Sequence, residues 1–164
     1  MMKVGLLIGS ESDIDIAREA ASILKKFSIP FSLEVTSAHR SPDRTVKLIK
    51  DLEADGVQVF IAAAGKSAHL AGVVAAHTVR PVIGVPVGGS SLNGLDALFS
   101  TVQMPKGIPV ACMGIGKSGG ANAALLAVQI LSLKDPSLEE KLKAFREETA
   151  REVEESSKRA QDKL

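Results

Sequence analysis

The chain has 164 residues, of which 45% are hydrophobic, a size and composition that fit one compact domain with a sizeable core. Its formal net charge of +1 comes from 20 basic and 19 acidic residues mixed along the chain, which argues against a basic surface for nucleic acid or an anionic membrane. Trp and Tyr are absent, so the aromatic platforms on which single-stranded nucleic acids stack are missing and a small-molecule partner is favoured.

Short apolar runs alternate with longer helix-like segments as far as about residue 133, which is typical of strands joined by crossover helices. The expected strands are Lys3–Ile8, Phe31–Thr36, Val57–Ala63, Val82–Val87 and Ile108–Met113. The expected helices are Ser12–Lys26, Pro42–Ala54, Ala68–Thr78, Gly94–Val102 and Gly119–Leu133. Because the strands lack clean polar alternation, we expect them to be buried on both faces. The predicted fold class is α/β: a three-layer αβα sandwich around a flavodoxin-like, doubly wound, parallel five-stranded sheet, of unpredicted strand order.

The segment after residue 133 breaks this pattern, although residues 1–164 are expected to form a single domain. We divide them into an α/β core, 1–133, and a charged C-terminal helical extension, 134–164, which Pro136 would begin. Apolar residues form a narrow stripe at helical spacing, namely Leu138, Leu142, Phe145 and Val153. A helix with so thin an apolar face either docks on a neighbouring subunit or remains a solvated tail, and we predict docking.

The one cysteine, Cys112, lies in an expected strand and is predicted to be a buried structural thiol, not a nucleophile. One cysteine cannot form a disulfide within its own chain, which fits a cytoplasmic protein. No apolar stretch approaches the ~20 residues that span a bilayer, so we expect no membrane association.

Polar, glycine-rich loops follow every expected strand, at the sheet edge where open parallel sheets bind ligands. In the first loop, Ser10 would donate to a phosphate at a helix N-terminus, while Ser12 and Asp13 could equally be helix caps or ligand-binding residues. The loop has neither the Walker A nor the Gly-x-Gly-x-x-Gly pattern, which favours a sugar 5-phosphate or a mononucleotide over a nucleoside triphosphate or NAD.

The loop after the second strand contains His39 followed by Arg40. Arginine can fork onto phosphate oxygens, and its charge favours the neutral imidazole beside it, which can accept and return a proton. The alternative is a simple turn, in which His39 caps the helix that Pro42 begins.

Two other histidines follow, and neither completes a metal site. His69 starts the helix after the third strand, at the same sheet edge as His39, whereas His77 lies two turns further along and is expected to be structural. The spacing of His69 and His77 is not the i, i+4 of a helical zinc pair, so no metal is predicted. A Gly-x-Ser-x-Gly elbow is also absent, which argues against a serine hydrolase.

Taken together, these loops resemble class I of the PurE family, to which the N5-carboxyaminoimidazole ribonucleotide mutases belong. The matching stretches are Gly9–Asp13, Ser37–Asp43, Ala68–Leu70, Gly84–Val87, Val102–Pro105, Gly107–Val110 and Ala121–Ala127, within a resemblance that runs from about Val4 to Leu133. It implies an isomerase of de novo purine (IMP) biosynthesis that is a homo-octamer, needs no cofactor and shares its active sites between subunits.

The resemblance also implies roles for particular residues. The substrate would be held by its 5-phosphate and ribose through Ser10, Asp13 and Arg40, and CO2 would leave a nitrogen and be recaptured by a ring carbon, with His39 carrying the proton. The predicted catalytic residues are His39 and His69. The predicted substrate-binding residues are Ser10, Ser12, Asp13, Ser37, Arg40, Gly65, Lys66, Ser67 and Leu70.

One loop departs from the class I pattern. Class I members usually have Gly-Gly-Ala-Ala-His-Leu-Pro-Gly where this chain has Gly65–Gly72, with Lys66 followed by Ser67. A basic residue followed by serine resembles class II, the aminoimidazole ribonucleotide carboxylases that use free CO2, whereas His69 resembles class I. We predict the mutase and keep the carboxylase as an alternative, together with a non-enzymatic nucleotide-binding assembly module on the same fold.

Overall fold

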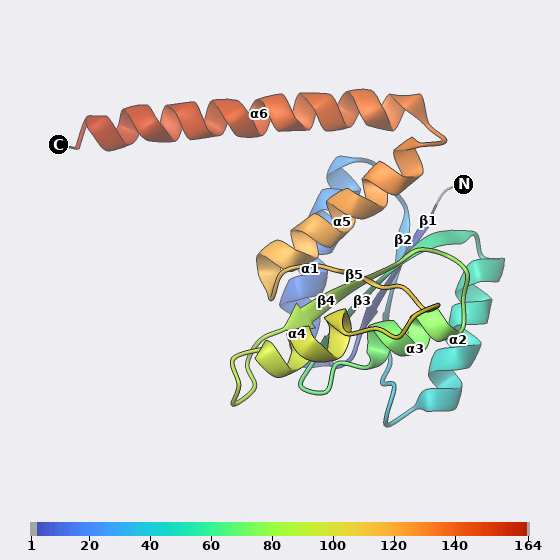
Figure 1. Cartoon of the computed structure of the whole chain (residues 1–164). Helices are drawn as coiled ribbons and strands as arrows, with labels where there is room; N and C mark the ends of the chain where they lie inside the picture. Colours follow the sequence, from blue (N-terminus) through green and yellow to red (C-terminus); the bar gives the residue numbers. More distant parts are fainter. Residues whose placement is uncertain (1–2, 164) are drawn as a thin grey trace.

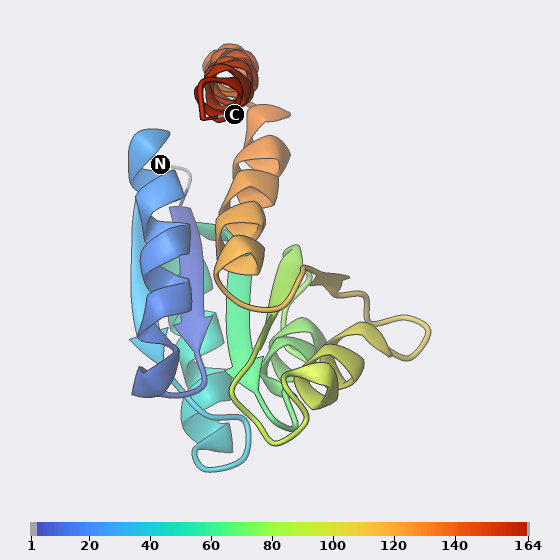
Figure 2. The same cartoon turned by 90° about the vertical axis from the view of Figure 1, so that its left-hand side faces the viewer.

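The computed structural model describes residues 3–163, which form a five-stranded parallel sheet with helices on both faces (Figures 1 and 2). The strands are β1 (Lys3–Ile8), β2 (Phe31–Val35), β3 (Val57–Gly65), β4 (Val82–Val87) and β5 (Ala111–Cys112). They lie in the order β2-β1-β3-β4-β5, which is the flavodoxin-like arrangement. The predicted fold class is therefore confirmed, and the strand order, which the sequence left open, is now defined.

Two layers of helices cover the sheet. The helices are α1 (Ile14–Lys26), α2 (Pro42–Ala54), α3 (Leu70–Ala76), α4 (Leu95–Val102), α5 (Lys117–Ser132) and α6 (Pro136–Gln161). Helices α1 and α5 pack on one face and share a hydrophobic core with residues of β1, β3 and β4. Helices α2 and α3 pack on the other face over a second core, and α4 lies beside α3 (Figure 2).

The expectation that every strand is buried on both faces is correct only for the centre of the sheet. β2 is an edge strand, paired on one side only, and its Leu33 and Val35 remain exposed. β5 is the other edge and has two residues instead of the six expected, since Pro109 lacks the N–H that a ladder hydrogen bond requires. Cys112 is half-buried there, not fully buried, and desolvation raises the pKa of its thiol.

Helix α6 begins as predicted, but its apolar stripe packs differently. Asp135 caps it by accepting a hydrogen bond from the Ser137 backbone N–H at 3.0 Å, and Pro136 takes the first helical turn. Leu138 and Leu142 are buried in the core of their own subunit. They do not require a partner subunit, so the prediction that the whole stripe docks elsewhere is wrong for this part of the helix.

The next turn of α6 is also held by its own subunit. The ring of Phe145 lies 5.7 Å from that of Phe27, and Lys26 forms an ion pair of 2.6 Å with Glu148. All described residues after Phe145 are exposed, including Val153, and this half of the helix projects beyond the body of the molecule (Figure 1). Among the helices of residues 3–163, none has the length and hydropathy needed to cross a membrane.

Candidate active site

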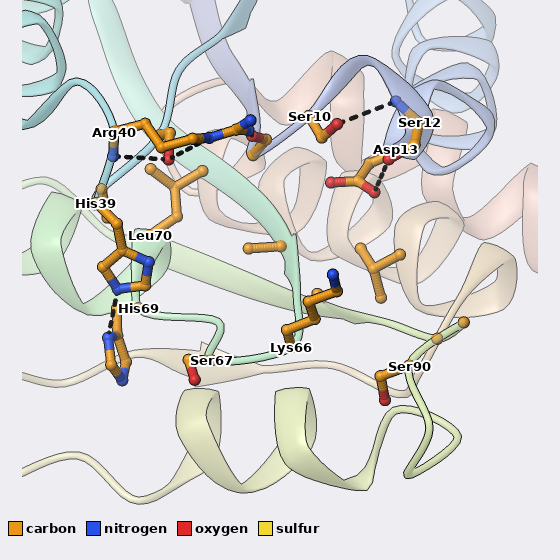
Figure 3. Close-up of a pocket in the computed structure, with 18 residues that line it drawn as sticks. Ser10, Ser12, Asp13, His39, Arg40, Lys66, Ser67, His69, Leu70 and Ser90 are labelled. Atoms are coloured by element: carbon orange, nitrogen blue, oxygen red, sulfur yellow. Dashed lines mark hydrogen bonds between the residues drawn. The ribbon is translucent and has the colours of Figure 1, made fainter.

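A pocket of about 630 Å³ lies at the carboxyl ends of β1, β2, β3 and β4 (Figure 3). Every residue that the sequence analysis assigned to the site lines it, namely Ser10, Ser12, Asp13, Ser37, His39, Arg40, Gly65, Lys66, Ser67, His69 and Leu70. These residues come from three loops that are far apart in the chain. The sheet brings the loops together because parallel strands end at the same edge.

The loop after β1 forms one wall of the pocket. Ser10 caps a single turn of 3-10 helix at Glu11–Asp13, since its hydroxyl accepts a hydrogen bond from the Ser12 backbone N–H at 3.4 Å. Asp13 occupies the N-cap position of α1, but its side chain makes no capping bond. The sequence analysis proposed that Ser12 and Asp13 either cap a helix or bind the ligand. Because the Asp13 side chain makes no capping bond, it does not cap α1.

The carboxyl group of Asp13 faces the pocket in a largely dry environment. Asp13 is 8% exposed, and the hydroxyl of Ser12 donates a hydrogen bond of 3.2 Å to its Oδ1. Desolvation raises the pKa of Asp13 above its ordinary value, although the bonds from Ser12 and from the backbone oppose this. A buried carboxyl of this kind can accept hydrogen bonds from neutral donors such as hydroxyl groups.

Arg40 joins the loops after β1 and β2. Its Nη2 donates to the carbonyl oxygen of Gly9 at 3.2 Å, and its Nε lies 3.5 Å from the hydroxyl of Ser37. The backbone N–H of Arg40 also donates to that hydroxyl, at 3.2 Å. None of these partners is a carboxylate, so they do not neutralise the positive charge of the guanidinium, and it can bind an anionic ligand.

His39 and His69 face each other across the pocket edge. Nε2 of His39 and Nδ1 of His69 are 2.7 Å apart, with ring centroids at 4.9 Å and ring planes at 87° (Figure 3). Helix α2 has Ser41 at its N-cap position, so the alternative in which His39 caps this helix is wrong. One ring nitrogen of the pair must carry the proton and the other must accept it.

His77 lies away from this pair, as the sequence analysis expected. It lines a second hollow of about 900 Å³ with Arg80 and Pro81, at the opposite edge of the sheet, where β4 begins. Its Nδ1 donates to the carbonyl oxygen of Val73 at 2.8 Å, which ends the short helix α3. Residues 3–163 contain no group of three His, Cys, Asp or Glu side chains that could hold a metal ion.

The loop after β3 supplies the remaining predicted residues. The carbonyl oxygen of Ser67 accepts a hydrogen bond from the His69 backbone N–H at 2.8 Å, while Leu70 is buried at the start of α3. Lys66 adopts a positive φ of 56°, a region that non-glycine residues rarely occupy. Its side chain extends into the pocket from the side opposite Arg40 (Figure 3).

The sequence analysis did not assign the loop after β4 to the site, but it also lines the pocket. The residues concerned are Val87, Gly88, Gly89 and Ser90, and the hydroxyl of Ser90 donates to Asp96 at 2.7 Å. The sequence did indicate a possible binding loop here, because small polar residues directly follow an apolar strand. Without the strand order, however, nothing distinguished this loop from the one after β5, which does not line the pocket.

Comparison with known proteins gives consistent matches. Residues 3–152 match the family model described as AIR carboxylase. The chain is 52% identical over 151 residues to the N5-carboxyaminoimidazole ribonucleotide mutase of Pyrococcus abyssi, covering 92% of this chain and 86% of that protein. It is 47% identical over 151 residues to the mutase of the same name from Escherichia coli K12, covering 92% and 89%. The crystal structure of Treponema denticola PurE superposes with a TM-score of 0.87 at 33% identity, covering 97% of this chain and 98% of that one.

Proposed function

The chain belongs to the AIR carboxylase family, and we propose that it is an N5-carboxyaminoimidazole ribonucleotide mutase of de novo purine biosynthesis. The enzyme converts N5-carboxyaminoimidazole ribonucleotide into 4-carboxyaminoimidazole ribonucleotide by moving the carboxyl group from the exocyclic nitrogen to a ring carbon. The identity of about half of the residues to mutases of this name, over nearly the whole chain, supports the mutase rather than the CO2-dependent carboxylase.

Arg40 and Ser10 are suited to hold the 5-phosphate of the substrate. The guanidinium of Arg40 has no charged partner and can bind two phosphate oxygens at once. Ser10 lies on the neighbouring loop at the start of a helical turn, and its hydroxyl, which accepts a bond from the Ser12 backbone N–H, can donate its own proton to an anion. Asp13 would repel a phosphate, so its buried carboxyl instead accepts hydrogen bonds from the ribose hydroxyls.

The hydrogen bond between His39 and His69 is the observation that carries the proposed mechanism. With His69 Nδ1 as the acceptor, His39 can be protonated on both nitrogens, and its Nδ1 is left for the substrate. His39 gives a proton to the exocyclic nitrogen as the nitrogen–carbon bond of the carbamate breaks and CO2 is released. The ring carbon then attacks the CO2, and His39 takes the proton that this carbon loses, which returns the imidazole to its starting state.

Recapture of CO2 requires a closed pocket, and in one chain the pocket is open. His39, His69 and Lys66 are all exposed. Neighbouring subunits would exclude water from this edge, which supports an assembly in which sites are shared. The chemistry moves a carboxyl group and a proton and needs no electron sink, so the proposed enzyme uses no cofactor.

Exposed apolar surface supports the assembly, which we propose to be a homo-octamer in the cytoplasm. Leu95, Phe99 and Val102 lie on one face of α4 and are 50%, 59% and 47% exposed. A helix face of this kind is typical of an interface. The projecting half of α6 is the second candidate contact, because an isolated, highly charged helix has little packing of its own to stabilise it.

The experiment that tests the function supplies two substrates separately. One is N5-carboxyaminoimidazole ribonucleotide, and the other is aminoimidazole ribonucleotide with CO2. We expect efficient turnover of the first, without acceleration by bicarbonate and with slow entry of labelled bicarbonate into the product. Rapid incorporation of label together with efficient use of aminoimidazole ribonucleotide and CO2 would replace the mutase by the carboxylase.

A further inference from the structure

Lys66 combines two features that a solvated loop lysine does not need. Its backbone has a positive φ of 56° in a loop between β3 and α3, where glycine would fit without strain. Strained backbone of this kind persists where the surrounding structure or a function requires it. The sequence carries a long cationic residue at this position in place of the glycine that the backbone favours.

The charge of Lys66 also has no ion-pair partner, because none of the ion pairs among residues 3–163 involves Lys66. Asp13 lines the same pocket, but it is not within ion-pair distance. An unpaired cation at the pocket wall is available for an anionic group of a ligand.

The proposed substrate carries two anionic groups, the 5-phosphate and the carboxyl group, and the pocket carries two lysine or arginine side chains. Arg40 is fixed to the wall formed by the loops after β1 and β2, where Ser10 completes a phosphate site. Lys66 lies across the pocket from Arg40, on the same loop as His69 and three residues before it (Figure 3). The second cation therefore lies apart from the phosphate site at Arg40, on the loop that also carries His69.

We propose that Lys66 is the specificity residue for the carboxyl group, pairing its ammonium with the carbamate of the substrate and with the carboxylate of the product. This inference rests on the proposed function. It assigns to one side chain the ability of the pocket to distinguish carboxylated ribonucleotides from aminoimidazole ribonucleotide, which lacks the carboxyl group. It also accounts for a lysine at a position with left-handed backbone.

The test compares the equilibrium affinities of variants for two ligands, 4-carboxyaminoimidazole ribonucleotide and aminoimidazole ribonucleotide. For Lys66→Ala, we expect a loss of roughly 10- to 100-fold in affinity for the carboxylated ligand, the size of a charge-assisted hydrogen bond, and a change within about twofold for the other. Lys66→Arg should keep most of the affinity. Lys47→Ala is the matched control, because Lys47 is an exposed lysine of α2 that pairs with Asp51 outside the pocket.

The variant Lys66→Gly distinguishes the effect of losing the ammonium on binding from the effect of backbone strain on stability. This variant removes the strain of the positive φ, so it should unfold at a higher temperature than the Ala variant while losing the same affinity for the carboxylated ligand. Equal losses for both ligands, or unchanged affinity for the carboxylated one, would overturn the proposal. Turnover by the wild-type enzyme is measured separately, so a failure of the mutase assignment is distinguished from a failure of the role of Lys66.

Discussion

Replacing Arg40 by alanine tests the phosphate site most directly, because the structure predicts an effect on binding with little effect on folding. The guanidinium bonds only to the Gly9 carbonyl and the Ser37 hydroxyl, and Arg40 is exposed, so water can replace it at both acceptors. A charge-assisted contact to a phosphate contributes about 1.5–3 kcal/mol, and about 1.4 kcal/mol is a tenfold change in affinity. We therefore expect ribonucleotide affinity to fall roughly 10- to 150-fold.

Titration calorimetry with aminoimidazole ribonucleotide and with its dephosphorylated nucleoside measures this effect. Arg40→Ala should weaken binding of the ribonucleotide and leave binding of the nucleoside nearly unchanged. Arg44→Ala is the matched control, because Arg44 pairs with Glu34 at the β2 edge and does not line the pocket. Equal losses for the two ligands would refute the assignment of Arg40 to the phosphate.

Three further variants test the remaining parts of the mechanism and the assembly. His39→Asn should lower kcat by ~10²–10⁴-fold with ribonucleotide binding retained, and near-normal turnover would assign the proton transfer to another group. Asp13→Asn should raise the free energy of unfolding at neutral pH, because burial raises the pKa of Asp13 and so disfavours its ionised form in the folded protein. The gain should shrink as the pH falls through the raised pKa of Asp13 and vanish below the ordinary pKa of an aspartate, 3.8. A gain that does not depend on pH would contradict this origin. Truncation after Glu148 keeps the buried Leu138 and Leu142 and should still reduce the size of the assembly in light scattering, whereas an unchanged assembly would show that the projecting half of α6 is not an interface.

Much of the fold followed from hydrophobic runs and turn residues. β1 and β4 have the predicted bounds, as does α2, where Pro42 begins the helix and Ala54 ends it. The loops were predicted as the site because polar and glycine-rich residues directly follow buried strands. These signals are local, so each could be found from a few neighbouring residues.

The errors concern contacts between distant parts of the chain. The apolar residues of α6 indicated a helix with something to bury, but not that Leu138 and Leu142 enter the core formed by α1 and α5. The exposure of Leu33 and Val35 depends on β2 being an edge strand, which is a property of the strand order. The Ser90 loop was missed for the same reason.

The strand order also explains how the two histidines meet. His39 follows β2 and His69 follows β3, and β1 lies between these strands, so their ends are about 10 Å apart at a spacing of ~4.8 Å per strand. The imidazoles must reach over the end of β1, where Gly9 lies at the pocket wall and presents only backbone. Its N–H donates to Ala63 at 2.9 Å and its carbonyl accepts from Arg40, so both backbone groups are satisfied without a side chain. A larger side chain at this position would begin against Ala64, which also lines the pocket, so the glycine leaves room for a ligand between Arg40 and the pair of histidines.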